Sequence, residues 1–248
     1  MKCLQVEAIE TPIFKLGDSL ANFIQTSLEK AGVDPKRLEG KILIITSKIV
    51  SLSEKRIVPK SEISKEALVK RESDHYMGEI AYGCFLTIKN GLFIPSAGID
   101  ESNAEGDFYI LYPADPYQAA LEIRNTLAGF WNLKNLGVIL SDSKVTPLRG
   151  GVTGVSLAHA GFRGVNSHVG QPDLFGTPLK MTTVNVADAL AAAAVVCMGE
   201  ANESCPLALV TADVHFQTSD AKTSEKEVSI PMDFDLYGPM FKRLGLES

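Results

Sequence analysis

The residues best suited to chemistry are Ser141-Asp142-Ser143, which directly follow the apolar run Gly137-Val138-Ile139-Leu140. Residues 144–154 then carry a proline, an arginine and three glycines, so we predict that a buried strand ends here at a polar loop. Open α/β sheets place catalytic and binding groups at such strand ends. A carboxylate between two hydroxyls offers oxygen ligands for a hard cation such as Mg²⁺ or Mn²⁺. The structural alternative is an Asx-type turn or a helix N-cap.

Two further acids follow apolar elements in the same way. Asp100 lies in a loop of small and polar residues after a hairpin predicted at Asn90-Gly91, and Glu200 follows an alanine-rich helix predicted to end at Gly199. For Asp100 the alternative is an ordinary exposed turn. Clustered carboxylates repel one another unless a cation intervenes. Two divalent ions that bridge phosphate oxygens would compensate the charge of all three acids and activate a phosphoryl group for transfer.

The elements that must position these acids are predicted from periodicity and composition. Strands are expected at residues 3–8, 41–50, 108–111 and 206–210, and helices at 20–32, 117–130 and, after a short strand, within 182–198. Residues 53–82 are expected to be mainly helical and partly exposed, and residues 161–178 to form a loop over the site. Lys48 lies inside the predicted strand 41–50. Its side chain either extends to solvent or reaches an anionic ligand.

Composition narrows the class of protein and of partner. The 248 residues suffice for one large domain or two small ones, and 45% apolar with 22% charged residues is typical of a packed soluble protein. A net charge of −6 without a dense Lys and Arg run argues against nucleic acid and favours a small-molecule substrate. The four cysteines form no CxxC pair, which argues against structural zinc. Without a long apolar run we expect no membrane span and a reduced, cytoplasmic protein.

Along nearly its whole length the sequence resembles the coenzyme F420-0:L-glutamate ligase family. The matching motifs occur in order: Thr11-Pro12-Ile13-Phe14, Thr46-Ser47-Lys48 with Glu54 and Arg56, Ala97-Gly98-Ile99-Asp100 with Asn103, Ser141-Asp142-Ser143, Arg149 with Gly151, Asp173-Leu174-Phe175-Gly176, Val186-Ala187-Asp188, and Met198-Gly199-Glu200. The resemblance implies an enzyme that uses GTP, or ATP, and a divalent metal to join L-glutamate to a carboxylate through an acyl-phosphate. It also implies a mixed α+β fold in an intertwined homodimer, with residues 1–248 as a single ligase-like domain that could divide into two lobes.

The resemblance also assigns roles by position. Asp100 and Asp142 look like ligands of one metal ion, and Ser143 and Glu200 like ligands of a second. Asp142 and Arg149 are the expected catalytic residues. The expected nucleotide contacts are Thr11, Pro12, Ile13, Phe14, Ser47, Lys48, Asn103, Met198, Gly199, Glu200, Ala201, Asn202, Glu203, Ser204 and Cys205.

Departures from the family pattern bear on the acceptor. The family typically has Asp-Thr-x-Gly-Arg-Pro-x-Arg, whereas this chain has Val145-Thr146 in place of Gly-Arg, and Leu52 stands where many relatives have a lysine. A lost arginine means one phosphate clamp fewer, which Lys48 could replace. Ser141-Asp142-Ser143, Thr146-Pro147-Leu148-Arg149 and residues 94–103 resemble the motifs of a bacterial subgroup assigned to folate metabolism, which leaves the acceptor open. The missing Gly-Arg pair favours a folate-like acceptor, with its carboxylate held by Arg149, over coenzyme F420-0.

Two other classes of protein fit the same residues. One is a non-catalytic nucleotide- or flavin-binding protein with the family fold, which the missing Gly-Arg pair and Leu52 would explain. The other is a metal-dependent phosphohydrolase, which would share the metal site but would release phosphate without glutamate.

Overall fold

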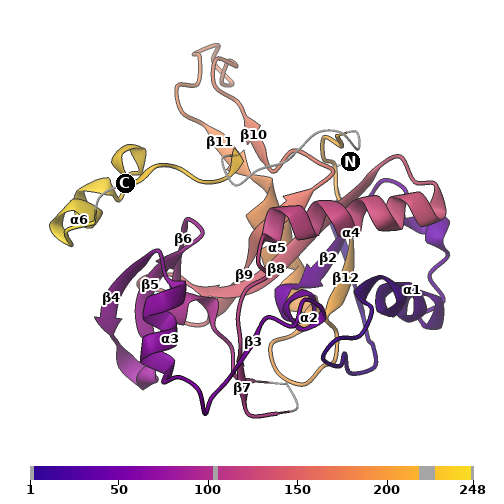
Figure 1. Cartoon of the computed structure of the whole chain (residues 1–248). Helices are drawn as coiled ribbons and strands as arrows, with labels where there is room; N and C mark the ends of the chain where they lie inside the picture. Colours follow the sequence, from indigo (N-terminus) through magenta and orange to yellow (C-terminus); the bar gives the residue numbers. More distant parts are fainter. Residues whose placement is uncertain (1–2, 103–105, 218–226, 247–248) are drawn as a thin grey trace.

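A five-stranded sheet forms the centre of the protein (Figure 1). The computed structural model describes residues 3–102, 106–217 and 227–246. In spatial order the strands are β1 (Gln5–Ile9), β12 (Leu207–Thr211), β2 (Lys41–Thr46), β8 (Leu136–Val145) and β9 (Val152–Ala160). Strands β2 and β8 pair in parallel, and the other neighbours in this sheet are antiparallel.

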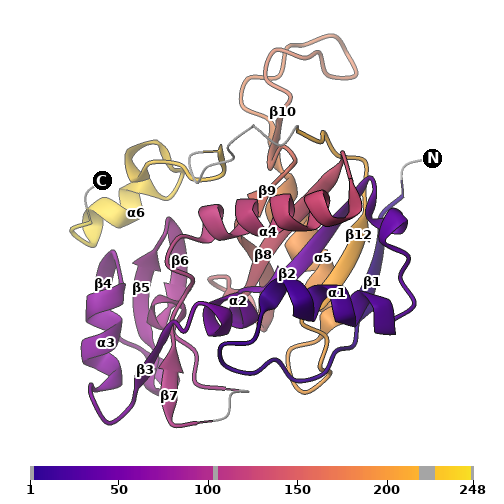
Figure 2. The same cartoon turned by 45° about the vertical axis from the view of Figure 1, so that its right-hand side comes forward.

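Both faces of this sheet are covered by helices, as the alternation of side chains along β2 requires. Leu43 and Ile45 pack into the cluster that includes residues of α1 (Leu20–Lys30), α2 (Ser47–Ser53) and α4 (Pro116–Trp131). Ile42 and Ile44 face the opposite way, against α5 (Val186–Met198). Figure 2 shows α1 and α4 side by side across the first of these faces.

A smaller unit lies beside the main sheet. It contains the antiparallel sheet β4 (His75–Glu79), β5 (Phe85–Lys89) and β6 (Leu92–Pro95), the helix α3 (Lys65–Glu72), and the two-stranded pair β3 (Ile57–Pro59) and β7 (Phe108–Ile110). The C-terminal helix α6 (Gly238–Arg243) lies next to it in both views, and the rings of Phe93 and Phe241 are 6.4 Å apart between centroids (Figures 1 and 2).

A hairpin-like arm projects from the main sheet. Its base is the pair β10 (Val165–Ser167) and β11 (Thr183–Asn185), and both views show the arm pointing away from the rest of the molecule (Figures 1 and 2). Leu174 and Phe175, on the segment between these strands, are almost fully exposed. The expected loop at residues 161–178 therefore contains a strand and lies on this arm rather than over the pocket described below.

Most of the expected elements are confirmed. The helices predicted at 20–32 and 117–130 correspond to α1 and α4, and the strand-then-helix prediction for 182–198 corresponds to β11 and α5. The hairpin at Asn90-Gly91 joins β5 to β6. No helix in the described part of the chain is long and apolar enough to cross a membrane.

Three expectations about elements are wrong. The β-branched run at 41–50 does not stay extended: Lys48 lies in α2, because Ile49, Val50 and Leu52 turn into the core from a helix. Strand β8 does not end at Asp142 but continues to Val145 through pairing with β9. Residues 53–82 hold the strands β3 and β4 as well as α3. Both strands are stabilised by antiparallel partners, β7 and β5, and the local sequence pattern does not reveal such partners.

The close packing of β9 against α5 can be tested by a substitution at Gly154. A Cβ added at Gly154 would lie 2.4 Å from the backbone oxygen of Ala191, so Gly154→Ala should lower the free energy of unfolding by about 1–3 kcal/mol. Gly150→Ala is the matched control, because its Cβ would meet no described atom within 4 Å. Urea unfolding measures both. Equal stability of the two variants would contradict the packing.

Candidate functional site

A pocket of about 640 Å³ opens where the parallel pairing of β2 with β8 ends. The last parallel pair is Thr46 with Ser141, so the residues that come next on each of the two segments enter the pocket from neighbouring positions. Its walls also include the smaller unit through Asp100 and Tyr112, and the loop after α5. The volume lies within the range of small-molecule and cofactor sites.

Asp142 lies on the wall of this pocket. The hydroxyl of Tyr112 donates a hydrogen bond to Asp142 Oδ2, and the backbone N–H of Ser143 donates another to the same carboxylate. Burial raises the pKa of Asp142 to about 6, and the negative charge of Asp100 adds to the rise, while the two donors and Lys48 act against it. The donors and the positive charge around this carboxylate are thus not sufficient to keep its pKa at the ordinary value of an aspartate.

Asp100 is paired with a cation that the chain itself provides. Lys48 Nζ lies 2.6 Å from Asp100 Oδ2 and also donates to the backbone oxygen of Ser102, 3.1 Å away. Burial pushes the pKa of Asp100 upward, but Lys48 and the donors of Ser102 hold that pKa below its usual value. Lys48 therefore reaches an anionic group rather than solvent, although from a helix and not from the predicted strand.

Ser143 and Glu200 form a second oxygen pair in the pocket. The Ser143 hydroxyl lies 2.6 Å and 2.7 Å from the two carboxylate oxygens of Glu200. Helix α5 ends at Met198, and the φ of 80° at the following Gly199 suits glycine and directs the chain into the loop that carries Glu200. The backbone N–H of Ala201 donates to Glu203 Oε2 at 2.8 Å, so this loop is folded around the Glu203 carboxylate.

A β-bulge helps to aim the residues around Asp142. The register between β8 and β9 shifts at Leu140 and Ser141, which leaves Leu157 between two paired positions of β9. Leu157 is buried in a cluster with Ile94 and Tyr112. The bulge therefore links the main sheet to the tyrosine that contacts Asp142.

The pocket brings together nearly all the residues that the sequence assigned to metal and nucleotide. Those that line it are Thr11, Pro12, Ile13, Phe14, Ser47, Lys48, Asp100, Asp142, Ser143, Met198, Gly199, Glu200, Ala201, Asn202, Glu203, Ser204 and Cys205. The backbone N–H of Thr11 donates to the oxygen of Ser204, which joins the two segments predicted to contact a nucleotide. Asn103 lies outside the described residues.

Arg149 is the predicted site residue that the structure does not bring to the pocket. It lies on the exposed turn between β8 and β9, next to Leu148, because β8 runs on to Val145 before the chain turns back. Val145, where the Gly-Arg pair of the family would begin, is also outside the pocket lining. In a single chain neither residue lines this pocket, and the role of Arg149 toward the acceptor stays a prediction.

Tyr112 is the site residue that the sequence analysis missed. It follows β7 and precedes Pro113, a position that indicates only the end of a strand. Its ring packs on Gly98, where an added Cβ would lie 2.0 Å from the ring, so the loop before Asp100 is shaped to the tyrosine. A large polar side chain directly after a short strand is the signal that could have suggested it.

The donor set suits hard cations only in part. Among the described residues, no three His, Cys, Asp or Glu side chains are grouped closely enough to hold a metal ion by themselves. The oxygens instead form two groups, one with Asp100 and Asp142 and one with Ser143 and Glu200. Lys48 already occupies a cation's position at Asp100. Mg²⁺ commonly takes one or two carboxylates and completes its shell with water and substrate phosphates, which agrees with this set.

Comparison with known proteins identifies the family. Residues 8–212 match the family model described as F420-0:Gamma-glutamyl ligase. The chain belongs to this family. A protein named coenzyme F420:L-glutamate ligase from Methanothermobacter thermautotrophicus is 35% identical over 216 residues, which cover 80% of this chain and 84% of the relative. Proteins of the same name from Methanopyrus kandleri and Methanocaldococcus jannaschii are 31% and 30% identical, over 77% and 84% of this chain and 79% and 87% of their own lengths.

Family membership makes the chain an enzyme of the ligase class, with the α+β architecture described above. The observed mixture of several sheets and packed helices agrees with the fold class that the sequence resemblance implied.

The contact between Tyr112 and Asp142 can be tested by titration. Because a donor to the charged form lowers a carboxyl pKa, Tyr112→Phe should raise the pKa of Asp142 above its present value of about 6. Carbon-13 NMR of the carboxylates in metal-free protein follows the change. Tyr82→Phe is the control, since Tyr82 is fully exposed. An unchanged or lower pKa in Tyr112→Phe would show that the hydroxyl does not stabilise the carboxylate.

Proposed function

We propose that the protein is a γ-glutamyl ligase that depends on a nucleoside triphosphate and a divalent metal. The main support for this proposal is one pocket. Asp100, Asp142 and Glu200 line it together with the segments Thr11–Phe14 and Met198–Cys205. Acids alone would repel a triphosphate, and a nucleotide site alone would not need three acids. Together they suit a triphosphate that arrives with cations.

Two cations would be held by different parts of the pocket. Asp100 and Asp142 would hold one, and Ser143 with Glu200 the other, while phosphate oxygens and water complete each shell. When bound, the cations neutralise phosphate charge and stabilise the charge that develops during phosphoryl transfer. Lys48 would be released from Asp100 by a cation and would then be available to a phosphate.

The proposed reaction has two steps. A carboxylate oxygen of the acceptor forms a bond to the terminal phosphorus of the nucleotide, and the bond to the bridging oxygen breaks, which releases nucleoside diphosphate. The amine of L-glutamate then attacks the acyl carbon, inorganic phosphate leaves, and the amine proton passes to solvent. The chain's residues bind and orient the reactants, and the partly enclosed pocket limits competing attack by water.

For the acceptor we propose a molecule of the coenzyme F420-0 type, as the description of the family and the names of the relatives suggest. The folate-like acceptor favoured by sequence rests on Val145-Thr146 and Arg149, and these residues lie outside the pocket lining of a single chain. Folate remains the second candidate, because the chain lacks the Gly-Arg pair of the family.

We also propose that the enzyme works as a homodimer. Leu174 and Phe175 on the arm are 98% and 93% exposed, and Val196 on the outer side of α5 is 84% exposed. Apolar side chains exposed to this degree on a projecting element favour cover by a second copy of the chain.

A product assay tests the proposed activity. Incubation with GTP or ATP, Mg²⁺ or Mn²⁺, L-glutamate and either coenzyme F420-0 or tetrahydrofolate should yield nucleoside diphosphate and an acceptor heavier by one glutamyl residue. Mass spectrometry identifies which acceptor is extended, and the ratio of kcat/KM values ranks the two. Phosphate release without glutamate would instead indicate a phosphohydrolase. Tight GTP binding without any diphosphate release would indicate a non-catalytic binding protein.

The carboxylates near Lys48 can be tested one at a time. Asp142→Asn and Asp100→Asn keep side-chain volume but remove an anionic ligand, so each should lower turnover about a hundredfold or more and weaken Mn²⁺ binding in the presence of GTP. Asp107→Asn, at a carboxylate that is 86% exposed, is the matched control and should change neither. Near-native activity of Asp142→Asn or of Asp100→Asn at limiting Mn²⁺ would show that the substituted carboxylate is not a metal ligand.

A further inference from the structure

A second cavity, of about 320 Å³, lies at the base of the arm. Its described lining consists entirely of polar and charged residues: Arg163, Asn166, Ser167, His168, Gln171, Asp213 and His215. A cavity with this lining does not suit an apolar ligand. None of these residues belongs to the pocket of the three acids.

Arg163 and His215 lie side by side in this cavity. Phe162 and Phe216 form an antiparallel bridge, and the backbone N–H of Arg163 donates to the oxygen of His215 at 2.9 Å. Residues directly opposite in such a pair project from the same face with Cβ atoms about 5 Å apart. Within the described part of the chain, neither side chain makes a hydrogen bond or an ion pair. An arginine and an imidazole are therefore both available to one ligand.

The backbone that carries this pair is firmly held. Phe162 is fully buried in the core cluster beneath α5. The neighbouring Gly164 donates its N–H to Glu227 Oε1 at 3.1 Å, and its carbonyl accepts the N–H of Val186 at the start of α5. The other oxygen of Glu227 lies 2.8 Å from His159 Nε2. These contacts fix the backbone position from which the Arg163 side chain projects.

Three further lining residues define what else a ligand must offer. The amide oxygen of Asn166 is buried and has no hydrogen-bond partner among the described atoms, so it can accept from a hydroxyl or amine. His168 Nδ1 is held by Gln171 Oε1 at 3.0 Å, which leaves its Nε2 for the cavity. Asp213 also lines the cavity and already has an interaction partner. Its negative charge would repel a highly anionic ligand.

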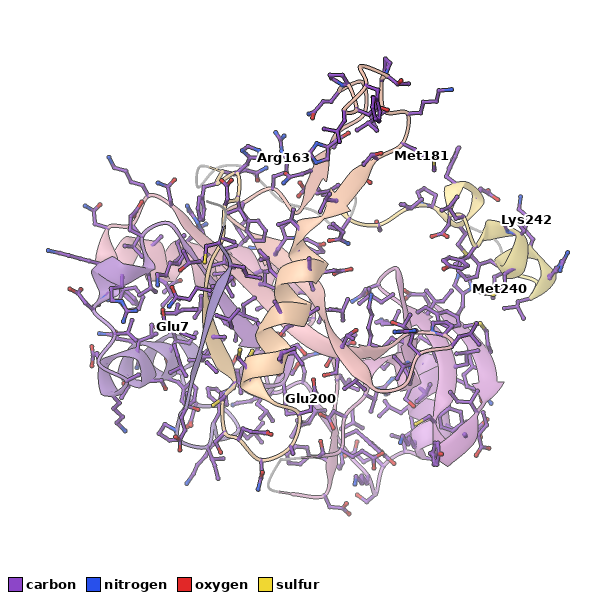
Figure 3. The ribbon with its side chains drawn as sticks, turned by 180° about the vertical axis from the view of Figure 1, so that it is seen from behind. Glu7, Arg163, Met181, Glu200, Met240 and Lys242 are labelled. Atoms are coloured by element: carbon purple, nitrogen blue, oxygen red, sulfur yellow. The ribbon has the colours of Figure 1, made fainter. Side chains whose placement is uncertain are left out.

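We propose that this cavity binds a small polar molecule that carries one oxyanion group and a hydroxyl or amino donor. Arg163 and His215 hold the oxyanion, a phosphate or a carboxylate, and Asn166 accepts from the donor group. The site is distinct from the pocket of the three acids in the same chain. Figure 3 shows Glu200 at one end of α5 and Arg163 beyond the other, and the 13 residues of the helix span roughly 20 Å.

The small number of histidines provides a selective readout. The chain has four, at positions 75, 159, 168 and 215, and no described residue lining the pocket of the three acids is a histidine. In protein with isotope-labelled histidine, glycerol 3-phosphate or lactate should shift the NMR signals of His168 and His215. Those of His75 and buried His159 should stay in place. The more effective of the two probes identifies the oxyanion as phosphate or carboxylate.

Variants decide whether the shifts report this site. Arg163→Gln should raise the Kd of the effective probe about tenfold or more, because a charged donor is lost. Lys36→Gln removes one exposed positive charge elsewhere and should leave the Kd unchanged. An unchanged His159 signal shows that each variant is folded. Stationary His168 and His215 signals with both probes at constant ionic strength, or equal affinity in Arg163→Gln, would overturn the proposal.

Discussion

The free-energy cost of ionising the half-buried Asp142 carboxylate is the constraint on which the site depends. Burial and the nearby charge of Asp100 both disfavour its ionised form, and its pKa of about 6 records this cost. The described surroundings offer two hydrogen-bond donors to Asp142 and one ammonium, Lys48, which is already paired with Asp100 at 2.6 Å. A cationic ligand would compensate this charge, which is why we propose one for the pocket.

The fold brings these groups together at the point where β8 stops pairing with β2. Parallel pairing of β2 with β8 places Lys48 and Asp142 just past the last shared pair, Thr46 with Ser141. Beyond that point β8 continues with β9 alone, and the bulge beside Ser141 leaves Leu157 packed near Tyr112. Helix α5 covers the opposite face and delivers Glu200 to Ser143. The site thus uses elements from both the main sheet and the smaller unit.

The sequence predicted the parts of this arrangement that depend on local pattern and short motifs. Asn90-Gly91, the apolar spacing of α4 and the glycine after α5 each specify local geometry, and the structure has the expected elements there. The sequence places Lys48 in a strand because Ile49 and Val50 favour extended structure, but packing of a helix against α1 overrides that preference. Arg149 and Tyr112 show the other limit, since how far β8 extends with β9, and which ring meets Asp142, depend on contacts distant in sequence.

The most direct test of a two-cation ligase site is a crystal structure with Mn²⁺ and a non-hydrolysable GTP analogue, measured for the anomalous signal of manganese. We predict two manganese peaks, one beside Asp100 and Asp142 and one beside Ser143 and Glu200, with the Lys48 ammonium moved from Asp100 toward a phosphate. Nucleotide bound in the pocket without manganese, and with Lys48 still paired to Asp100, would contradict it.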